Sequence, residues 1–258
     1  MSVMVIVGDR FQKFASDKND VLTVSDLEQE IWKDSPLRTK EIVIGQGVEH
    51  DRFLGMINLM ARKKKGVVTV KNMHQIMDQC NPIHQASVHK HKRENILITK
   101  PVAQEDGTFF ANISICDSGE LLNDHSTGQH IQGIIITEAG RQMLISTSEY
   151  HLLSAADKGN SYFVLNSLNT DFKRFAFPLP ITIVLRVLSE NRKAGQYLKV
   201  DCEISFFQND ALIATVRSNY AAYSNNFIRE KESALANLAY ESGQKEMWND
   251  GDIAVPGI

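Results

Sequence analysis

The chain has 258 residues, a formal net charge of -3 and 43% hydrophobic residues. This is enough apolar material for one or two domains, and the charge balance excludes the broad basic surface of a typical nucleic-acid-binding protein. No apolar stretch approaches the roughly 20 residues that span a bilayer, and the N-terminus has no signal-like pattern, so we expect a cytoplasmic protein without a membrane partner. Three widely spaced cysteines, Cys80, Cys116 and Cys202, indicate neither a disulfide framework nor a metal site.

The first eighty residues predict a small α/β unit. Three β-prone apolar runs, at 3–7, 42–44 and 67–70, alternate with amphipathic segments that predict helices. Ser25 is expected to cap the first helix, with Glu28 completing a capping box, and the second helix runs from about Glu49 to Lys65. This alternation favours a parallel, Rossmann-like sheet for a domain at residues 1–82, to which the sequence assigns no role.

The turn Gly45-Gln46-Gly47 stands between a predicted strand and a predicted helix. Backbone amides at such a turn can bind a phosphate group, and Gly8-Asp9-Arg10 occupies the equivalent place after the first strand. The third glycine of the dinucleotide fingerprint is absent, and a tight strand-to-helix turn explains the pattern equally well. Gly45, Gln46 and Gly47 are therefore candidate phosphate-binding residues with a structural alternative.

From residue 83 onward the pattern changes to longer strands. Runs at 96–100 and 108–116 flank a turn and predict a hairpin, and later runs at 162–177, 181–188, 197–208 and 211–223 predict an antiparallel sheet. We place this second domain at 83–226 and a C-terminal helix and tail at 227–258. Its histidine-rich start contains His84, His89 and His91 beside lysines and an arginine, which favours a solvated junction over a metal site; no cofactor is expected.

One segment of this domain combines a helical pattern with buried charge. The apolar residues from Ile131 to Leu144 surround nearly the whole circumference of a helix, which indicates burial. Glu138, Arg141 and Gln142 nevertheless share one face of it. Glu138 is the first candidate for general acid or base, because burial raises the pKa of a carboxyl and a nearby Arg141 lowers it. Arg141 and Gln142 would orient that carboxylate or hold a substrate oxygen, and the alternative is a purely structural Glu–Arg pair.

Two histidines precede this helix. His125 and His130 lie in the loop that enters it, where an imidazole can transfer protons near neutral pH, although either can equally be a loop hydrogen-bonding group. Gly133 would allow a substrate carbonyl to approach the amides at the start of the helix, unless its role is packing alone. Cys116 ends an apolar run and is expected to be a small core residue.

The order H-x-x-G at residues 130–133, followed by E-A-x-R-Q at 138–142, resembles the A-factor biosynthesis hotdog family. The resemblance extends to Val88-His89-Lys90 and to Tyr162-Phe163-Val164-Leu165, with Gly140 where an alanine is usual. It implies an α+β chain in which a hotdog domain, an antiparallel sheet wrapped around one central helix, follows the small α/β domain.

The same resemblance implies a function. An enzyme of this kind handles acyl thioesters, through acyl transfer or condensation from a β-ketoacyl carrier protein in butyrolactone-like signal or secondary-metabolite synthesis. A hotdog thioesterase or dehydratase, or a noncatalytic acyl-binding dimerisation module, are the alternatives. The partner would be an acyl carrier protein or a coenzyme A thioester, and a single hotdog unit implies a homodimer.

Overall fold

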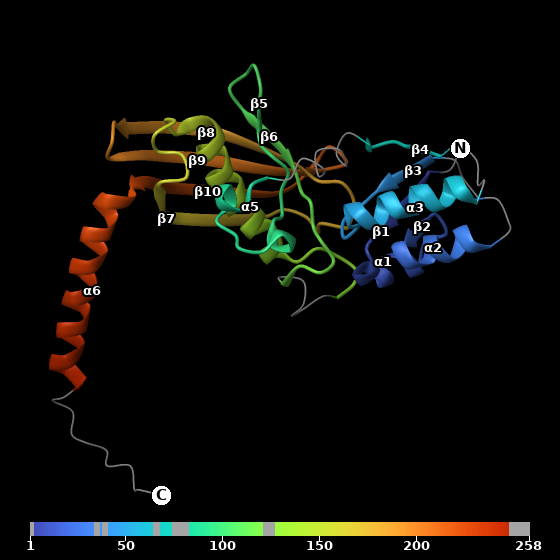
Figure 1. The fold of residues 1–258 in the computed structure, drawn as a ribbon, viewed down its shortest axis with the longest axis horizontal. Helices are drawn as coiled ribbons and strands as arrows, with labels where there is room; N and C mark the ends of the chain where they lie inside the picture. Colours follow the sequence, from blue (N-terminus) through green and yellow to red (C-terminus); the bar gives the residue numbers. More distant parts are fainter. Residues whose placement is uncertain are drawn as a thin grey trace, which may run out of the picture.

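The computed structural model describes residues 3–33, 37, 41–63, 68–73, 83–120 and 127–247. Two sheets organise the chain: a four-stranded parallel sheet in the order β2-β1-β3-β4, and a six-stranded antiparallel sheet in the order β5-β6-β8-β9-β10-β7. They lie side by side along the long axis of the molecule, and helix α6 extends from the far end (Figure 1). No described helix has both the length and the apolar character needed to cross a membrane.

The parallel sheet forms the α/β unit. Its strands are β1 (Met4–Val7), β2 (Val21–Thr23), β3 (Glu41–Ile44) and β4 (Thr69–Val70). Its helices are η1 (Asp9–Phe11), α1 (Gln12–Ser16), α2 (Val24–Trp32) and α3 (His50–Arg62). Side chains alternate along β1, so that Ile6 packs with α2 and α3 while Val7 packs with α1. The predicted parallel, Rossmann-like arrangement is confirmed.

Helix α2, which is the first helix predicted from the sequence, is capped by other residues than those predicted. The Thr23 hydroxyl accepts a hydrogen bond from the Asp26 amide at 3.1 Å, and the Asp26 carboxylate accepts one from the Thr23 amide at 3.1 Å. The predicted capping box of Ser25 and Glu28 is therefore wrong. Both of those side chains instead accept hydrogen bonds from Arg52 on α3, each at 3.0 Å.

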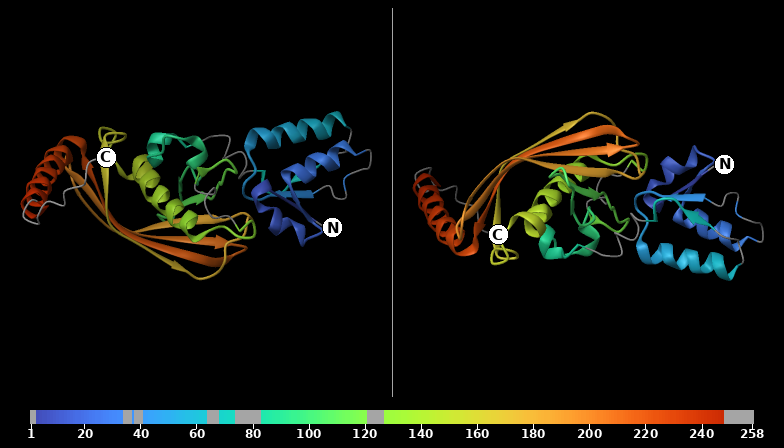
Figure 2. Two further views of the ribbon diagram at one scale, coloured as in Figure 1. Left: turned by 90° about the horizontal axis from the view of Figure 1, so that it is seen from below. Right: turned by 90° about the horizontal axis from the view of Figure 1, so that it is seen from above.

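The antiparallel sheet curves around helix α5 (Gly133–Thr147), which continues as a π-helix, η5 (Ser148–Leu152) (Figure 2). Its strands are β5 (Val102–Ala103), β6 (Phe109–Asn112), β7 (Ser161–Phe172), β8 (Thr182–Lys193), β9 (Tyr197–Gln208) and β10 (Ala211–Ser224). Ile135, Met143 and Leu144 of α5 are fully buried in one core with Ile204 and Val216 of the sheet. The predicted helix wrapped by a sheet is confirmed.

Several boundaries differ from the prediction. The hairpin partner of β6 is the short strand β5, whereas the predicted strand at 96–100 contributes only one bridge, between Ile98 and Ile113. Strand β7 ends at Phe172 instead of residue 177, and the polar C-terminal helix α6 runs from Asn225 to Met247. Two short helical turns, η2 (Gln85–Val88) and η3 (Arg93–Asn95), precede the first strands of this sheet.

Glycine in the middle of α5 has a packing reason. A Cβ at Gly140 would lie 3.1 Å from Val216 Cγ2 on β10, a tight contact that would require Val216 to give way slightly. The absence of a side chain at Gly140 therefore lets α5 approach β10 closely.

Candidate functional site

A pocket of about 420 Å³ lies at the start of α5. Two of the candidate residues, His130 and Gly133, line it together with Phe172, Phe175 and Ile136. Phe172 and Phe175 are 53% and 70% exposed, so the pocket has an aromatic rim that faces solvent in the single chain. The sequence prediction missed both phenylalanines, because it treated the segment after residue 172 as a continuing strand.

The imidazole of His130 is held by two contacts. Its Nδ1 lies 3.2 Å from the Thr127 hydroxyl oxygen, and its ring meets the ring of Phe175 edge-on with centroids 5.2 Å apart. A hydrogen bond at Nδ1 fixes the ring orientation, which leaves Nε2 as the nitrogen that can exchange a proton with a substrate. The other candidate histidine, His125, lies outside the described residues.

Gly133 is the first residue of α5 and is packed against an aromatic ring. A Cβ added there would lie 2.8 Å from Phe172 Cζ, so the ring occupies the space that any larger residue would need. The preceding residue, Gln132, makes no side-chain capping bond to the first turn of the helix. Because the first amides of a helix carry partial positive charge, this end of the pocket suits an oxygen that develops negative charge.

Glu138 is surrounded by donors. Arg141 binds it through two nitrogens, Nε to Oε2 at 2.7 Å and Nη2 to Oε1 at 2.8 Å. Lys90 Nζ lies 2.8 Å from Oε1, and Gln142 Nε2 donates to the same oxygen at 3.0 Å. Burial alone would raise the pKa of Glu138, but these donors outweigh it and hold that pKa at about 2. Glu138 is therefore a permanently charged carboxylate near neutral pH.

Gln142 is fully buried and uses its whole amide. Besides the bond to Glu138, its Nε2 donates to the Asn95 carbonyl at 2.9 Å, and its Oε1 accepts from the Leu97 amide at 2.8 Å. Gln142 thus joins α5 to the segment after η3, and its side chain has no N–H left to donate to the substrate oxygen suggested by the sequence. The predicted clustering of Glu138, Arg141 and Gln142 is observed, and Lys90, which the sequence prediction did not include, completes it.

The candidate residues on α5 fall into two groups. His130 and Gly133 border the pocket at the start of the helix, whereas Glu138 and Arg141 lie further along and contact the region of η2, where Arg141 also donates to the Val88 carbonyl at 3.4 Å. No hydrogen bond or ion pair between described residues joins His130 to Glu138. His130, just before α5, and the charged cluster around Glu138, on α5, are therefore two separate groups of polar residues.

The histidines of the junction line a separate pocket of about 480 Å³ with Lys90 and Glu149. His89 packs edge-on against Phe163, and burial together with the charge of Arg141 lowers its pKa. Within the described ranges, no group of three or more His, Cys, Asp or Glu residues is arranged to hold a metal ion.

The glycine turn after β3 is occupied by protein groups. Gln46 uses both ends of its side-chain amide, donating to the Ile113 and Leu179 carbonyls and accepting from the Ile115 amide. The backbone amides of the turn are also used. That of Gly45 donates to the Ile6 carbonyl at 2.7 Å, that of Gln46 to the Pro178 carbonyl at 3.0 Å, and that of Gly47 to the Ile115 carbonyl at 3.0 Å. The contacts of Gln46 and Gly47 join the α/β unit to the segments that follow β6 and precede β8. Together with the bond from Gly45 to Ile6, they leave no amide of Gly45, Gln46 or Gly47 for a phosphate in this conformation.

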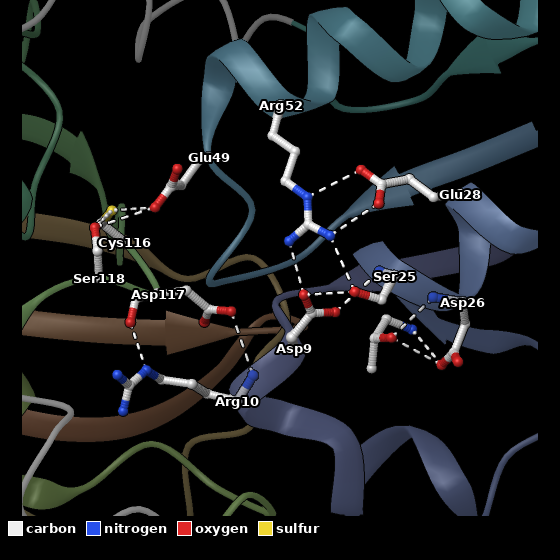
Figure 3. Close-up of polar contacts among 11 residues, drawn as sticks. Asp9, Arg10, Ser25, Asp26, Glu28, Glu49, Arg52, Cys116, Asp117 and Ser118 are labelled. Carbon is white, nitrogen blue, oxygen red and sulfur yellow. Dashed lines mark hydrogen bonds and ion pairs between the residues drawn. The ribbon is translucent and has the colours of Figure 1, made fainter.

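Asp117 reaches into the same region, between the turns after β1 and β3 (Figure 3). A Cβ would lie 2.3 Å from Asp117 Oδ1 if placed on Gly8, and 2.4 Å from it if placed on Gly47, so only glycine fits at either position. Asp117 Oδ1 is buried without a hydrogen-bond partner among the described residues. Beside it, Cys116 is half-buried, not in the core as expected, and its Sγ lies 3.3 Å from Glu49 Oε1.

Asp117 predicts a specific pH dependence of stability. Burial raises its pKa from 3.8 to about 6. Since the folded protein binds this proton more tightly than the unfolded chain, the stabilising contribution is complete below about pH 4 and is lost as the pH rises towards 6. We expect Asp117→Asn to raise the melting temperature at pH 7.5 relative to wild type and to change it little at pH 4, as measured by calorimetry. A lower melting temperature of the variant at pH 7.5 would contradict this account.

The antiparallel sheet wrapped around α5 defines the second domain as a hotdog. Residues 72–224, more than half of the chain, match the family model of the A-factor biosynthesis hotdog domain, and the chain belongs to this family. No curated protein matches the chain.

Solved structures with a similar fold include a conserved protein of Pseudomonas aeruginosa, 17% identical over 54% of this chain and 99% of that one, with a TM-score of 0.39. Another is the PaaI protein of the phenylacetic acid degradation operon of E. coli, 15% identical over 58% of this chain and 98% of that one, with a TM-score of 0.36.

Proposed function

We propose that this chain is an enzyme that transfers the acyl group of a thioester to an alcohol, with the pocket at the start of α5 as the reaction site. The observation that supports the proposal is the joint lining of one apolar pocket by His130 and Gly133. Its aromatic and aliphatic walls suit the acyl part of a thioester, and its polar end combines an imidazole with the start of a helix. Membership of the A-factor biosynthesis hotdog family supports the same substrate class.

In the proposed reaction His130 acts as general base and then as general acid. Its Nε2 removes the proton of the attacking hydroxyl while the oxygen forms a bond to the thioester carbonyl carbon. The amides at the start of α5 stabilise the negative charge on the carbonyl oxygen. The carbon–sulfur bond then breaks, and the departing thiolate takes the proton back from His130. The Thr127 and Phe175 contacts keep the imidazole oriented during both steps.

Glu138 has a different part in this proposal. A carboxylate with a pKa of about 2 is a poor proton acceptor near neutral pH, so its task is to fix Lys90 and Arg141. Lys90 and Arg141 carry two positive charges and Glu138 carries one negative charge, so this cluster has one positive charge in excess. Arg141 therefore remains a candidate for binding an anionic oxygen of the substrate or of its carrier.

The experiment that tests the proposal offers the protein thioesters of coenzyme A and of an acyl carrier protein, with saturated and β-keto acyl chains. Each is supplied with and without a glycerone-phosphate-like alcohol, and thiol release is measured together with the mass of the product. An ester formed only with the alcohol supports acyl transfer. A free acid would instead assign a thioesterase, an unsaturated thioester a dehydratase, and saturable binding without turnover an acyl-binding module.

We also propose that the protein is a homodimer. The edge strand β7 spans 12 residues and exposes Tyr162, Leu165 and Phe172. An edge with unpaired backbone groups and apolar side chains is suited to pairing with a second copy. We expect a dimer in sedimentation velocity at micromolar concentration, and a shift towards monomer in Leu165→Lys. A wild-type protein that sediments only as a monomer would contradict the proposal.

A further inference from the structure

The parallel-sheet unit contacts both described ends of the connection between β6 and α5. At the first end, the Arg10 amide donates to Asp117 Oδ2 at 3.3 Å, and Arg10 Nε donates to the Asp117 carbonyl (Figure 3). At the second end, the amide of Phe14 donates to the Gly128 carbonyl at 2.9 Å. Helical segments η1 and α1 thus hold this connection on both sides, and its second end leads directly to His130.

The backbone is fixed both before and after His130 in the chain, at Gly128 and at Ile131. Gly128 has a φ of +68°, and a Cβ there would lie 3.1 Å from the Arg10 carbonyl oxygen, so the chain approaches η1 closely at this residue. Ile131 is buried, and its amide donates to the Ala176 carbonyl at 2.8 Å. Only Gln129 separates His130 from Gly128, so a shift of Gly128 changes where the imidazole lies.

Phe14 also contacts the segment that carries the pocket rim. Its ring stacks on that of Phe177, with centroids 5.8 Å apart. Phe177 in turn is fixed by Gln208 of β9, which accepts from its amide at 3.1 Å and donates to its carbonyl at 2.9 Å. Phe175, two residues earlier, is the ring that meets His130. Phe14 therefore supports both segments that hold the imidazole, the first through its backbone amide and the second through its ring.

From this arrangement we propose that Phe14 is a positioning residue for His130, and that the α/β unit serves to hold the proton-transfer group of the hotdog domain in place. The inference rests on the proposed role of His130. Phe14 does not line the pocket and acts only through the backbone at Gly128 and the ring of Phe177. Reacting groups need placement within about half an ångström, so support from outside the pocket affects the rate.

A matched pair of variants tests the proposal: Phe14→Leu and Phe53→Leu. Both rings are buried in the α/β unit, but Phe53 belongs to the core between β1, α2 and α3, which is separate from the core that contains Phe14 and Ile131. The first readout is the imidazole ¹H–¹³C NMR signal of His130 without substrate, assigned with His130→Gln. We expect the signal to shift or broaden in Phe14→Leu and to stay at its wild-type position in Phe53→Leu.

The second readout is turnover. Misplacement of a catalytic group lowers kcat, so we expect Phe14→Leu to reduce kcat at least about tenfold with little change in KM, and Phe53→Leu to retain wild-type values. Arg10→Ala removes the contact to the Asp117 carbonyl without removing a buried ring, and it should shift the His130 signal by a smaller amount.

The outcomes separate the two proposals. A His130 signal that stays unchanged in both Phe14→Leu and Arg10→Ala, or that shifts equally in Phe53→Leu, overturns the positioning role. A shift specific to Phe14→Leu in a protein that turns over no thioester supports the positioning role and overturns the proposed acyl transfer.

Discussion

Replacing His130 with glutamine is expected to lower acyl-thioester turnover by about a hundredfold or more while leaving the fold intact. Glutamine retains a hydrogen-bonding side chain beside Thr127 but cannot accept and return a proton. The measurement is kcat/KM from thiol release, with circular dichroism and thermal unfolding to confirm the fold.

The matched control is His91→Gln, which changes an exposed histidine of the junction. It should retain wild-type turnover. Equal activity of wild type and His130→Gln would show that His130 does not transfer the proton and would remove the basis for a reaction at this pocket.

Glu138→Gln has the second large expected effect, and it is mainly on stability. The sequence-based hypothesis of a general acid or base predicts a folded variant with about a hundredfold lower turnover. The structure predicts instead a loss of at least about 2 kcal/mol in the free energy of unfolding, because Lys90 and Arg141 lose the carboxylate between them. Denaturant unfolding at pH 7 measures this loss.

Two further measurements on Glu138 sharpen the test. The folded pKa of about 2 lies below the ordinary 4.5, so its stabilising contribution is complete above about pH 4.5 and is lost as the pH falls towards 2. This acid-side loss should be weaker in Glu138→Gln. Adding Lys90→Met removes one of the two unpaired cations and should recover part of the lost stability. Unchanged stability of the single variant at pH 7 would refute this account.

Long, regular elements were predictable because their pattern repeats. Strand β9 alternates between buried and less buried residues along its whole length, and its predicted and observed limits are both Tyr197 and Gln208. The three-residue strand β2 is too short for any alternation, and it was missed together with the cap at Thr23 that follows from it. Helix α5 was found from its apolar circumference, although it begins at Gly133 instead of Ile131.

The chemistry of the candidate site was less predictable, because it depends on contacts between distant residues. The sequence identified both influences on the pKa of Glu138 but not their balance, which Lys90 helps to decide from 48 positions away. The rim formed by Phe172 and Phe175 depends on the chain leaving the sheet after β7. The position of Asp117, directly after an apolar run, is the one feature of the sequence that could have drawn attention to it. Its closeness to Gly8 and Gly47 results from the fold and could not be predicted from the sequence.

The boundary at residue 82 or 83, which separates two patterns in the sequence, does not separate two cores. Val7, Phe11, Phe14, Ala15 and Val21 belong to the same apolar cluster as α5 and the large sheet. A hotdog excised at this boundary would expose that surface to water, so the two parts do not behave as interchangeable modules. Recombination that replaced the first part with an unrelated α/β domain would have to rebuild this shared surface, and we expect the two to be inherited as one unit.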